Sequence, residues 1–216
     1  MPAASPVVTP STTTTWAARP AAASAAGQAV YVTDVGVNGS VWFSNGTAWV
    51  LMATPLTLAH KFSNALMDGS MGANTDIYLD GHTIAAGVLG AASGLRITAA
   101  YSFLGSGTAN RAPQIKAYFG VGSYQISFTS LLDTRDQFST QKSLLLSVTL
   151  QNKNSMAVNQ IRPNDYTGGV SGNRFADSAI DFTQAVTIGF GALNNASSAN
   201  ANDQQLLEWF SIELIA

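Results

Sequence analysis

Residues 205–215 (QLLEWFSIELI), the last run of the chain, constrain the fold more than any other stretch. Phe210, Ile212 and Leu214 fall on one side of an extended strand and the residues between them fall on the other, which is the alternation of a half-buried β-strand. Such a strand is stable only where earlier strands supply its hydrogen bonds and a second apolar layer covers its inner face. We therefore expect the chain to end inside a sheet. Glu208 would lie on the inner side of this strand, and a bulge, an open sheet edge or a subunit contact explains that placement better than catalysis does.

The segment from His82 to the end of the chain has the pattern of strands joined by turns. Residues 95–103 alternate between an apolar face and a more polar one, and similar alternation recurs in residues 115–119, 124–128, 144–150 and 186–190. About eight such strands at short spacing, with no long helix between them, predict an antiparallel β-sandwich of the jelly-roll type. The predicted fold class is all-β, with the jelly roll over residues 82–216.

Two segments before the sandwich carry weaker patterns. Residues 1–28 are rich in Ala, Pro, Ser and Thr, with Arg19 as their only charged side chain. Such a segment buries too little apolar surface to offset its ordering entropy, which predicts an extended, mobile arm. A linker, a tail lying on its own domain, and an arm docked on a neighbouring subunit all remain open. Residues 54–81 mix apolar runs with Gly, Asp and Asn breakers and are predicted to be a connector.

Residues 29–53 predict a three-stranded β-meander. Short β-prone runs are separated by turns containing Asn38-Gly39 and Asn45-Gly46, dipeptides that accept the positive φ of a type I′ hairpin. A sheet this small is marginal alone. We therefore expect its aromatic side chains to pack against another chain, the arm or the main domain. The aromatic side chains are those of Tyr31, Trp42, Phe43 and Trp49. Any of them that is exposed would mark an interface.

Composition narrows the range of partners. Only 10% of the residues are charged, against roughly 25% in ordinary soluble domains. A formal net charge of −2 gives no electrostatic reason to bind nucleic acid or an anionic membrane, so neither is an expected partner. The absence of cysteine excludes disulfides and thiolate metal sites. The N-terminal run lacks the basic and apolar regions of a signal peptide, and no window is long and apolar enough for a membrane anchor, so we expect neither.

No motif points to catalysis or to a cofactor. The two histidines, His60 and His82, stand apart from any nucleophile motif, and no G-x-S-x-G elbow is present. A glycosidase needs two facing carboxylates, and the sequence pairs none of the candidates, which are Asp133, Asp136, Asp165, Asp177, Asp181, Glu208 and Glu213. Asp76, Asp80 and His82 are a weak candidate for a bound ion because their spacing matches no ligand signature. We predict no catalytic residue, no cofactor and no metal.

Residues 15–52 resemble a short β module of structural proteins from tailed bacteriophages, in which an Ala/Pro arm leads into V-T-D-x-G and G-x-x-W-x-S-N-G-T-x-W. The matching residues are Arg19, Pro20, Gly27, Val32, Thr33, Asp34, Gly36, Gly39, Trp42, Ser44, Asn45, Gly46, Thr47 and Trp49. Residues 82–103 and 114–126 similarly resemble jelly-roll domains of phage fibres and decoration proteins, through an L-x-x-x-S-G-L-R-I phrase and a K-x-Y-F-G strand.

The resemblance implies a virion structural protein, usually a homotrimer, whose N-terminal part attaches it and whose jelly roll projects outward. We predict a non-enzymatic short fibre or appendage subunit, with capsid, portal or tail proteins as partners and a host surface glycan as a candidate ligand. The alternatives are a capsid decoration or cement protein that stabilises the head shell, and a glycan-cleaving virion enzyme. Candidate attachment residues are Trp16, Arg19, Pro20, Tyr31, Trp42, Phe43 and Trp49, and candidate receptor-facing loop residues are Tyr166, Arg174, Phe175, Asn194, Asn195 and Asn200.

Overall fold

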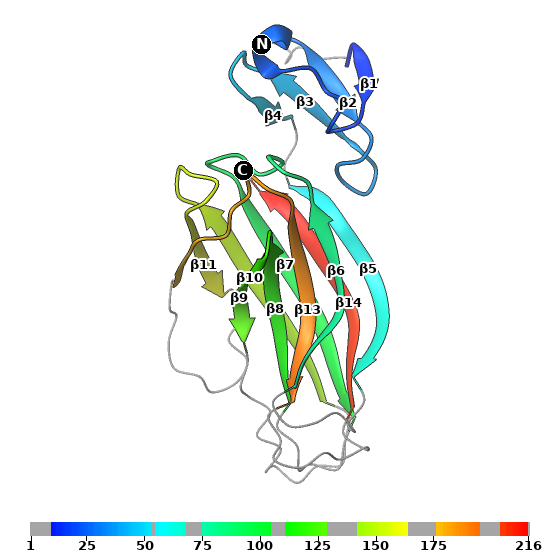
Figure 1. Ribbon diagram of the computed structural model, residues 1–216. Coiled ribbons are helices and arrows are strands. Elements are labelled where there is room, and N and C mark those ends of the chain that lie inside the picture. The colour runs from blue at the N-terminus through cyan, green and yellow to red at the C-terminus, as the bar shows by residue number, and fades with distance from the viewer. Residues whose placement is uncertain are drawn as a thin grey trace, which may run out of the picture. The chain divides into compact units, whose positions relative to one another are not determined.

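Strands make up almost all of the regular structure in the computed structural model, which describes residues 10–52, 55–67, 75–104, 111–128, 142–163, 176–194 and 204–215. They form three sheets, and the short 3-10 helix η1 (Ala22–Ala25) is the remaining named element (Figure 1). The chain divides into two compact units, residues 1–58 and 59–216. The all-β fold class predicted from the sequence is confirmed.

The N-terminal unit is a four-stranded sheet with the order β1-β2-β3-β4. Its strands are β1 (Thr12–Thr14), β2 (Ala29–Val32), β3 (Ser40–Ser44) and β4 (Trp49–Leu51). The last three pair antiparallel and confirm the predicted meander. β1 adds a parallel neighbour, with Thr13 opposite Tyr31 on β2. The fourth strand of the sheet therefore comes from residues 1–28, the segment that the composition predicts to be a mobile arm.

The prediction of an extended arm over residues 1–28 is wrong for the described part, residues 10–28. Trp16 is only 4% exposed, and its ring centroid lies 4.6 Å from that of Trp42 on β3. The segment is rich in small residues, but the one large ring of Trp16 supplies enough buried apolar contact to order it. Of the open alternatives, the structure has this segment packed on its own domain.

The turns of the meander differ from the predicted type I′ geometry. That geometry needs positive φ at both central residues, and among the described non-glycine residues only Asn154, in the other unit, has a positive φ. Asn45 Oδ1 instead accepts hydrogen bonds from the N–H groups of Thr47 and Ala48, at 2.9 and 2.8 Å. The turn at residues 45–46 thus forms through side-chain capping and the left-handed backbone of Gly46, whose φ is 87°.

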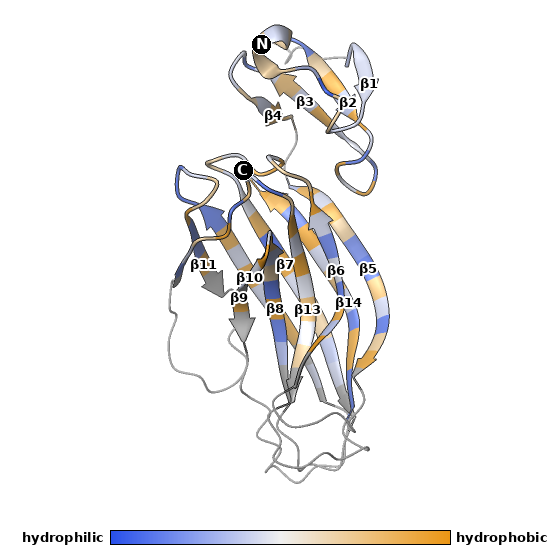
Figure 2. Ribbon diagram, viewed as in Figure 1, coloured by the Kyte–Doolittle hydropathy of each residue, from blue (hydrophilic) through white to orange (hydrophobic). Residues whose placement is uncertain are grey.

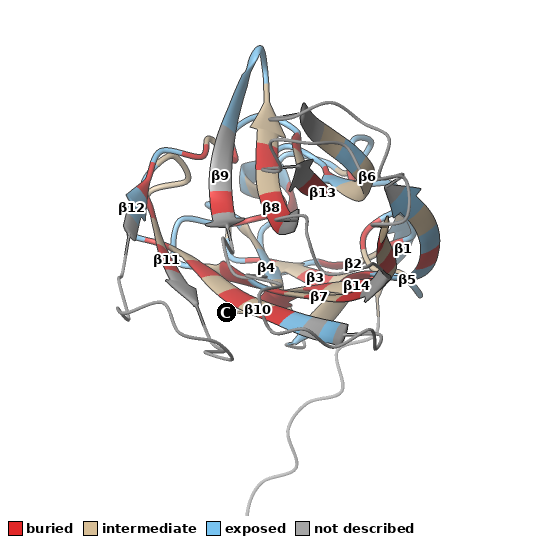
Figure 3. Cartoon of the chain, turned by 90° about the horizontal axis from the view of Figure 1, so that it is seen from below, coloured by how far each residue is buried: buried red, intermediate tan, exposed pale blue. Residues whose placement is uncertain are grey.

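The second unit is a two-layer sandwich, seen along its strands in Figure 3. One sheet contains, in spatial order, β12 (Ala176–Ser178), β11 (Asn159–Pro163), β10 (Lys142–Asn152), β7 (Gly94–Leu104), β14 (Gln204–Ile215) and β5 (Leu56–Met67). The other contains β6 (Thr75–Ile84), β13 (Val186–Asn194), β8 (Arg111–Phe119) and β9 (Gly122–Phe128).

The strand pairs of the sandwich are nested. β8 pairs with β9, β7 with β10 and β6 with β13, and β5 is hydrogen-bonded to β14. This is the pairing of one long antiparallel ribbon, and rolling the ribbon brings β14 beside β7 and β13 beside β8. A rolled ribbon of eight strands in two sheets is the jelly roll, as predicted.

The prediction that residues 54–81 form a connector is wrong. β5 lies in this segment, and β6 starts in it, so the sandwich contains residues well before His82. Burial along β5 does not alternate cleanly, because Leu58 and Ala59 are both buried and Phe62 is 77% exposed. β5 is an edge strand with a hydrogen-bonded neighbour on one side only. The sequence of such a strand has a weaker alternation of apolar and polar residues than that of a central strand.

β14 is a central strand, and the predicted irregularity at Glu208 is a β-bulge. The register with β7 shifts between Leu207 and Trp209. Both Leu207 and Phe210 are buried, because the extra residue changes which positions face the core. Ser102 Oγ donates a 2.6 Å hydrogen bond to Glu208 Oε1, which keeps the carboxylate out of the apolar interior.

The core of the sandwich is made by the inner faces of both sheets. Phe190 on β13 stacks on Phe210 on β14 with ring centroids 4.4 Å apart, and both side chains are almost completely buried. Tyr101 on β7 donates its hydroxyl to the carbonyl oxygen of Gln114 on β8, at 3.1 Å. Apolar and polar bands alternate along the strands that supply these residues (Figure 2).

A buried polar network lies at the β10–β11 end of the sandwich. Asn159 donates from Nδ2 to Asn152 Oδ1 at 2.7 Å, and its own Oδ1 accepts from Ser178 Oγ and the N–H of Ile180 at 3.0 and 2.8 Å. Asn152 donates in turn to the carbonyl oxygen of Gly90, at 2.9 Å. These bonds join β10, β11 and β12 to the segment before β7. Nothing in the sequence pattern pointed to this network.

Candidate functional site

Most of the predicted attachment residues hold the N-terminal unit together. Trp16 and Trp42 are buried against each other. The Arg19 guanidinium lies 3.5 Å from the ring centroid of Trp16 and donates to the Trp16 carbonyl oxygen. Trp49 Nε1 donates to the carbonyl oxygen of Pro20, at 3.0 Å. These contacts fasten the leading segment over one face of the small sheet.

The opposite face of the small sheet is apolar and is not covered by the leading segment. We call it the open face, and its residues are Tyr31, Val41, Phe43, Val50 and Met52. Phe43 lies directly across from Val50, and the N–H of Met52 bonds to the carbonyl oxygen of Val41 at 3.0 Å. Val50 and Met52 are 46% and 45% exposed, and the other three are half-buried. Contiguous exposed apolar side chains are typical of a contact surface.

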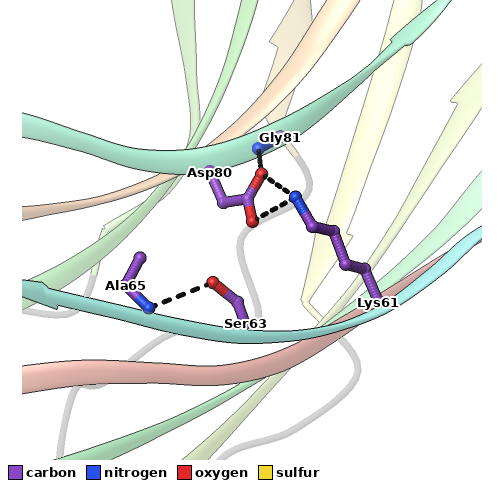
Figure 4. Close-up of polar contacts among 5 residues, drawn as sticks. All are labelled: Lys61, Ser63, Ala65, Asp80 and Gly81. Atoms are coloured by element: carbon purple, nitrogen blue, oxygen red, sulfur yellow. Dashed lines mark hydrogen bonds and ion pairs between the residues drawn. The ribbon is translucent and has the colours of Figure 1, made fainter.

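The weak ion-site candidate is occupied by an ion pair. Lys61 Nζ on β5 lies 2.9 and 2.7 Å from the two carboxylate oxygens of Asp80 on β6, and the N–H of Gly81 donates to the same carboxylate at 2.8 Å (Figure 4). Burial raises the pKa of Asp80, but the bonds from Lys61 and Gly81 outweigh it and hold the pKa below 3.8. Burial lowers the pKa of His82. The pair links the edges of the two sheets, and no cluster of three metal-ligating side chains occurs among the described residues.

The predicted receptor-facing loops fall largely outside the described residues. Tyr166, Arg174, Phe175, Asn195 and Asn200 belong to that part of the chain. Asn194 is the last residue of β13, opposite Thr75 and Arg111.

The outer face of the four-stranded sheet carries a pair of tyrosines over glycines. Tyr78 on β6 and Tyr118 on β8 approach edge to face, with ring centroids 5.9 Å apart. A Cβ added to Gly189, on β13 between them, would lie 2.6 Å from Tyr118 Cε2 and 2.7 Å from Tyr78 Cε2. We call this surface the tyrosine face. Burial raises the pKa of both hydroxyls, with a further contribution to Tyr78 from the charge of Asp80.

The outer face of the six-stranded sheet carries a second aromatic group at its β5 edge. His60 and Phe62 on β5 meet edge to face with ring centroids 5.5 Å apart, and His60 lies 5.9 Å from the Trp209 ring on β14. Phe62 is 77% exposed. Neither aromatic group was predicted from the sequence. Their signal was the presence of aromatic residues at outward positions of strands, and it could be read only once β5 and β6 were known to be strands.

The described candidates for catalytic carboxylates are engaged by donors. Glu208 accepts from Ser102, and Glu213 pairs with Arg96 at 3.1 Å. Asp177 pairs with Lys153 at 3.1 Å, and Asp181 caps the turn that follows it, where bonds from Gln184 and Thr183 lower its pKa. The contacts of Glu213 and Asp177 are surface ion pairs, that of Asp181 is a turn cap, and that of Glu208 is a hydroxyl bond at the β-bulge. In the described part of the chain, no helix is long and apolar enough to span a membrane.

Comparisons with known proteins found only distant structural likenesses. No protein-family model matches the chain, and no curated protein matches it. A structure of infectious bursal disease virus, Gx strain, matches 86% of this chain and 37% of that chain, at 13% identity and a TM-score of 0.42. The VP2 subviral particle of the same virus matches 78% and 35%, at 13% identity and a TM-score of 0.34. The basic winged bean lectin with Tn-antigen matches 83% and 88%, at 10% identity and a TM-score of 0.34.

The chain thus spans little more than a third of the viral chains that it matches. At these scores the likenesses assign neither a family nor a function to it.

Proposed function

We propose that this chain is a non-enzymatic structural protein of a virus particle, in which the N-terminal unit makes subunit and attachment contacts and the jelly roll carries the ligand-binding surface. The observation that carries the proposal is the open face. The leading segment seals one side of the small sheet, whereas Phe43, Val50 and Met52 leave the other side apolar and accessible. A sheet of this size gains stability from a partner on such a face.

The finer assignment follows the sequence resemblance. Residues 15–52 are similar to a module of tailed-phage structural proteins, and that similarity supports a short trimeric fibre or appendage subunit attached to capsid, portal or tail proteins. The alternative of a capsid decoration protein drew its support from an arm docked on the shell. It loses that support because residues 10–28 pack within their own unit. A host surface glycan is the proposed ligand of the jelly roll.

The mass of the full chain in solution tests the assembly part of the proposal. We expect a trimer by light scattering, and we expect the double substitution Val50→Ser and Met52→Ser to shift the mass toward the monomer while the far-ultraviolet circular dichroism stays that of a folded β protein. Val121→Ser is the matched control, because Val121 is fully exposed at the β8–β9 turn of the other unit. A wild-type chain that is monodisperse as a monomer would contradict the proposal.

A further inference from the structure

On the tyrosine face, the Tyr78 ring packs directly on glycines, where a side chain would leave it no room. The outward positions of β13 in its middle are Gly189 and Gly191, and Gly81 on β6 lies opposite Gly189. A Cβ added to Gly81 would clash with the Tyr78 hydroxyl, and a Cβ added to Gly189 would clash with the Cε2 edge of the same ring. The ring therefore lies against the strands instead of projecting from them. Bulkier residues at Gly81 or Gly189 would push it away.

The exposed part of this ring faces solvent beside polar groups. Tyr78 is 52% exposed. On the same face, the hydroxyls of Thr83 and Thr187 lie 2.7 Å apart on β6 and β13, and Thr187 is opposite Tyr118 on β8. Lys116 is opposite Gly189, and burial lowers the pKa of its amine. An accessible aromatic ring thus lies within a few residue positions of hydroxyl donors and acceptors.

From this arrangement we infer that the tyrosine face is a saccharide-binding site, at which a pyranose ring stacks on Tyr78 and its hydroxyls bond to Thr83 and Thr187. An aromatic face carries negative charge density, and the axial C–H groups of a pyranose present weakly positive hydrogens to it. Threonine hydroxyls both donate and accept, as sugar hydroxyls do. The inference rests on the proposed function, because it supplies the ligand surface of the jelly roll, and it places that surface on a sheet instead of on the loops around Tyr166 and Asn195.

Two competing roles for the tyrosine pair are separated by the same test. In the first, the rings serve packing alone, by covering glycines that would otherwise expose backbone. In the second, the face contacts a second copy of the chain. Packing alone predicts no sugar contact, and a subunit contact predicts a change of mass when Tyr78 is replaced.

The experiment is saturation-transfer NMR on the full chain, with methyl glycosides of glucose, galactose, mannose, N-acetylglucosamine and sialic acid as probes, each at about 50 mM so that a Kd near 1 mM is detected. We expect transfer to the ring protons of at least one glycoside. Tyr78→Ala should raise its Kd by about tenfold, the loss expected for one aromatic stacking contact, and Tyr78→Phe should leave it nearly unchanged.

Two further variants keep the result interpretable. Phe62→Ala removes an exposed ring of similar size from the other sheet and should leave the Kd unchanged. The double substitution Thr83→Val and Thr187→Val keeps the Tyr78 ring and its packing, and should weaken binding even if Tyr78→Ala proves unstable in a thermal melt. No transfer to any glycoside, binding that survives both the Tyr78→Ala and the threonine substitutions, or loss of binding only in Phe62→Ala would overturn the inference.

The mass measurement tests the assembly proposal, and the sugar-binding experiment tests the saccharide site, so the two can fail independently. A trimer that binds none of these sugars overturns the saccharide site and leaves the assembly proposal standing. A monomer that binds a sugar through Tyr78 overturns the assembly proposal and leaves the saccharide site standing.

Discussion

In the N-terminal unit, the Trp16 ring packs on Trp42, and side-chain donors such as Trp49 Nε1 bond to backbone carbonyls of the leading segment. In the jelly roll, stacked Phe190 and Phe210 lie among many buried aliphatic side chains. The small sheet cannot bury enough surface through its own strands, so it depends on a few large contacts with a segment outside the meander. The sandwich spreads its stability over two full layers. Loss of one contact should therefore matter more to the small unit than to the large one.

The largest expected effect is on Trp16. Trp16→Ala should cost about 3–5 kcal/mol of the stability of the N-terminal unit, because it removes the ring that joins the leading segment to the sheet. Three of the four tryptophans, Trp16, Trp42 and Trp49, lie in this unit and Trp209 lies in the sandwich, so fluorescence and far-ultraviolet circular dichroism report the two units differently. We expect the fluorescence transition in urea to move to low concentration and the circular dichroism transition of the sandwich to stay in place.

Phe210→Ala is the matched substitution in the sandwich. Its cost in kcal/mol should be similar, but it should be a smaller fraction of the stability of the sandwich, which is spread over two layers. It should shift the circular dichroism transition and leave the early fluorescence transition in place. If both substitutions lower one common transition, the two units unfold together and the comparison fails.

A smaller effect is expected at Asn159, where the sandwich depends on polar contacts. Asn159→Ala leaves Asn152 Oδ1, the Ser178 hydroxyl and the Ile180 N–H without their buried partner. One unsatisfied buried group costs about 1–3 kcal/mol. The three groups belong to one hydrogen-bond network, so their costs do not simply add, and we expect a total below that of Trp16→Ala. Equilibrium urea unfolding should therefore show a clearly reduced free energy of unfolding. The exposed Asn64 on β5 is the control, since Asn64→Ala should change that free energy by no more than about 0.5 kcal/mol.

The smallest effect concerns pH and the Lys61–Asp80 pair. Because the folded pKa of Asp80 lies below its ordinary value of 3.8, its contribution to stability is present above that value and is lost as the pH falls through the folded pKa. Lys61 is 56% exposed, so solvent screening keeps the contribution below about 1 kcal/mol. Asp80→Asn should reduce stability near neutral pH and show no difference from wild type in strong acid.

Asp177→Asn is the control for that prediction. Asp177 pairs with Lys153 on the surface, with both side chains substantially exposed, so the substitution should change the free energy of unfolding near neutral pH by no more than about 0.5 kcal/mol. A difference for Asp80→Asn that persists at low pH would mean that the substitution acts through packing and not through charge.

Several features of the fold were predictable because they are local. The alternation in β14 gave its buried face, and the one residue that violated it, Glu208, lies at the bulge. The Asn-Gly dipeptides marked the meander turns, although the Asn45 side chain forms its turn in a way that the type I′ pattern does not describe. Each of these depends on residues a few positions apart.

The candidate sites were less predictable because they combine distant strands. The tyrosine face joins Tyr78, Gly189 and Tyr118, which come from three strands, and one of those strands was predicted to be a connector. Asp80 and His82 lie close together in sequence and suggested an ion site, yet the partner that neutralises Asp80 is Lys61 from the opposite sheet. Sequence spacing does not reveal a partner on another layer.

By itself the sequence determined the all-β class, the strand alternation, the turns of the meander and the absence of cysteine chemistry. Only the tertiary structure decided that β5 and β6 open the jelly roll, that Trp16 closes the small sheet, and which residues meet on each outer face. The physical reason is that alternation is set by the geometry of a single strand, whereas pairing depends on which distant segment covers it. The terminal strand reaches its neighbour β5 across more than half of the chain, and no local pattern records that contact.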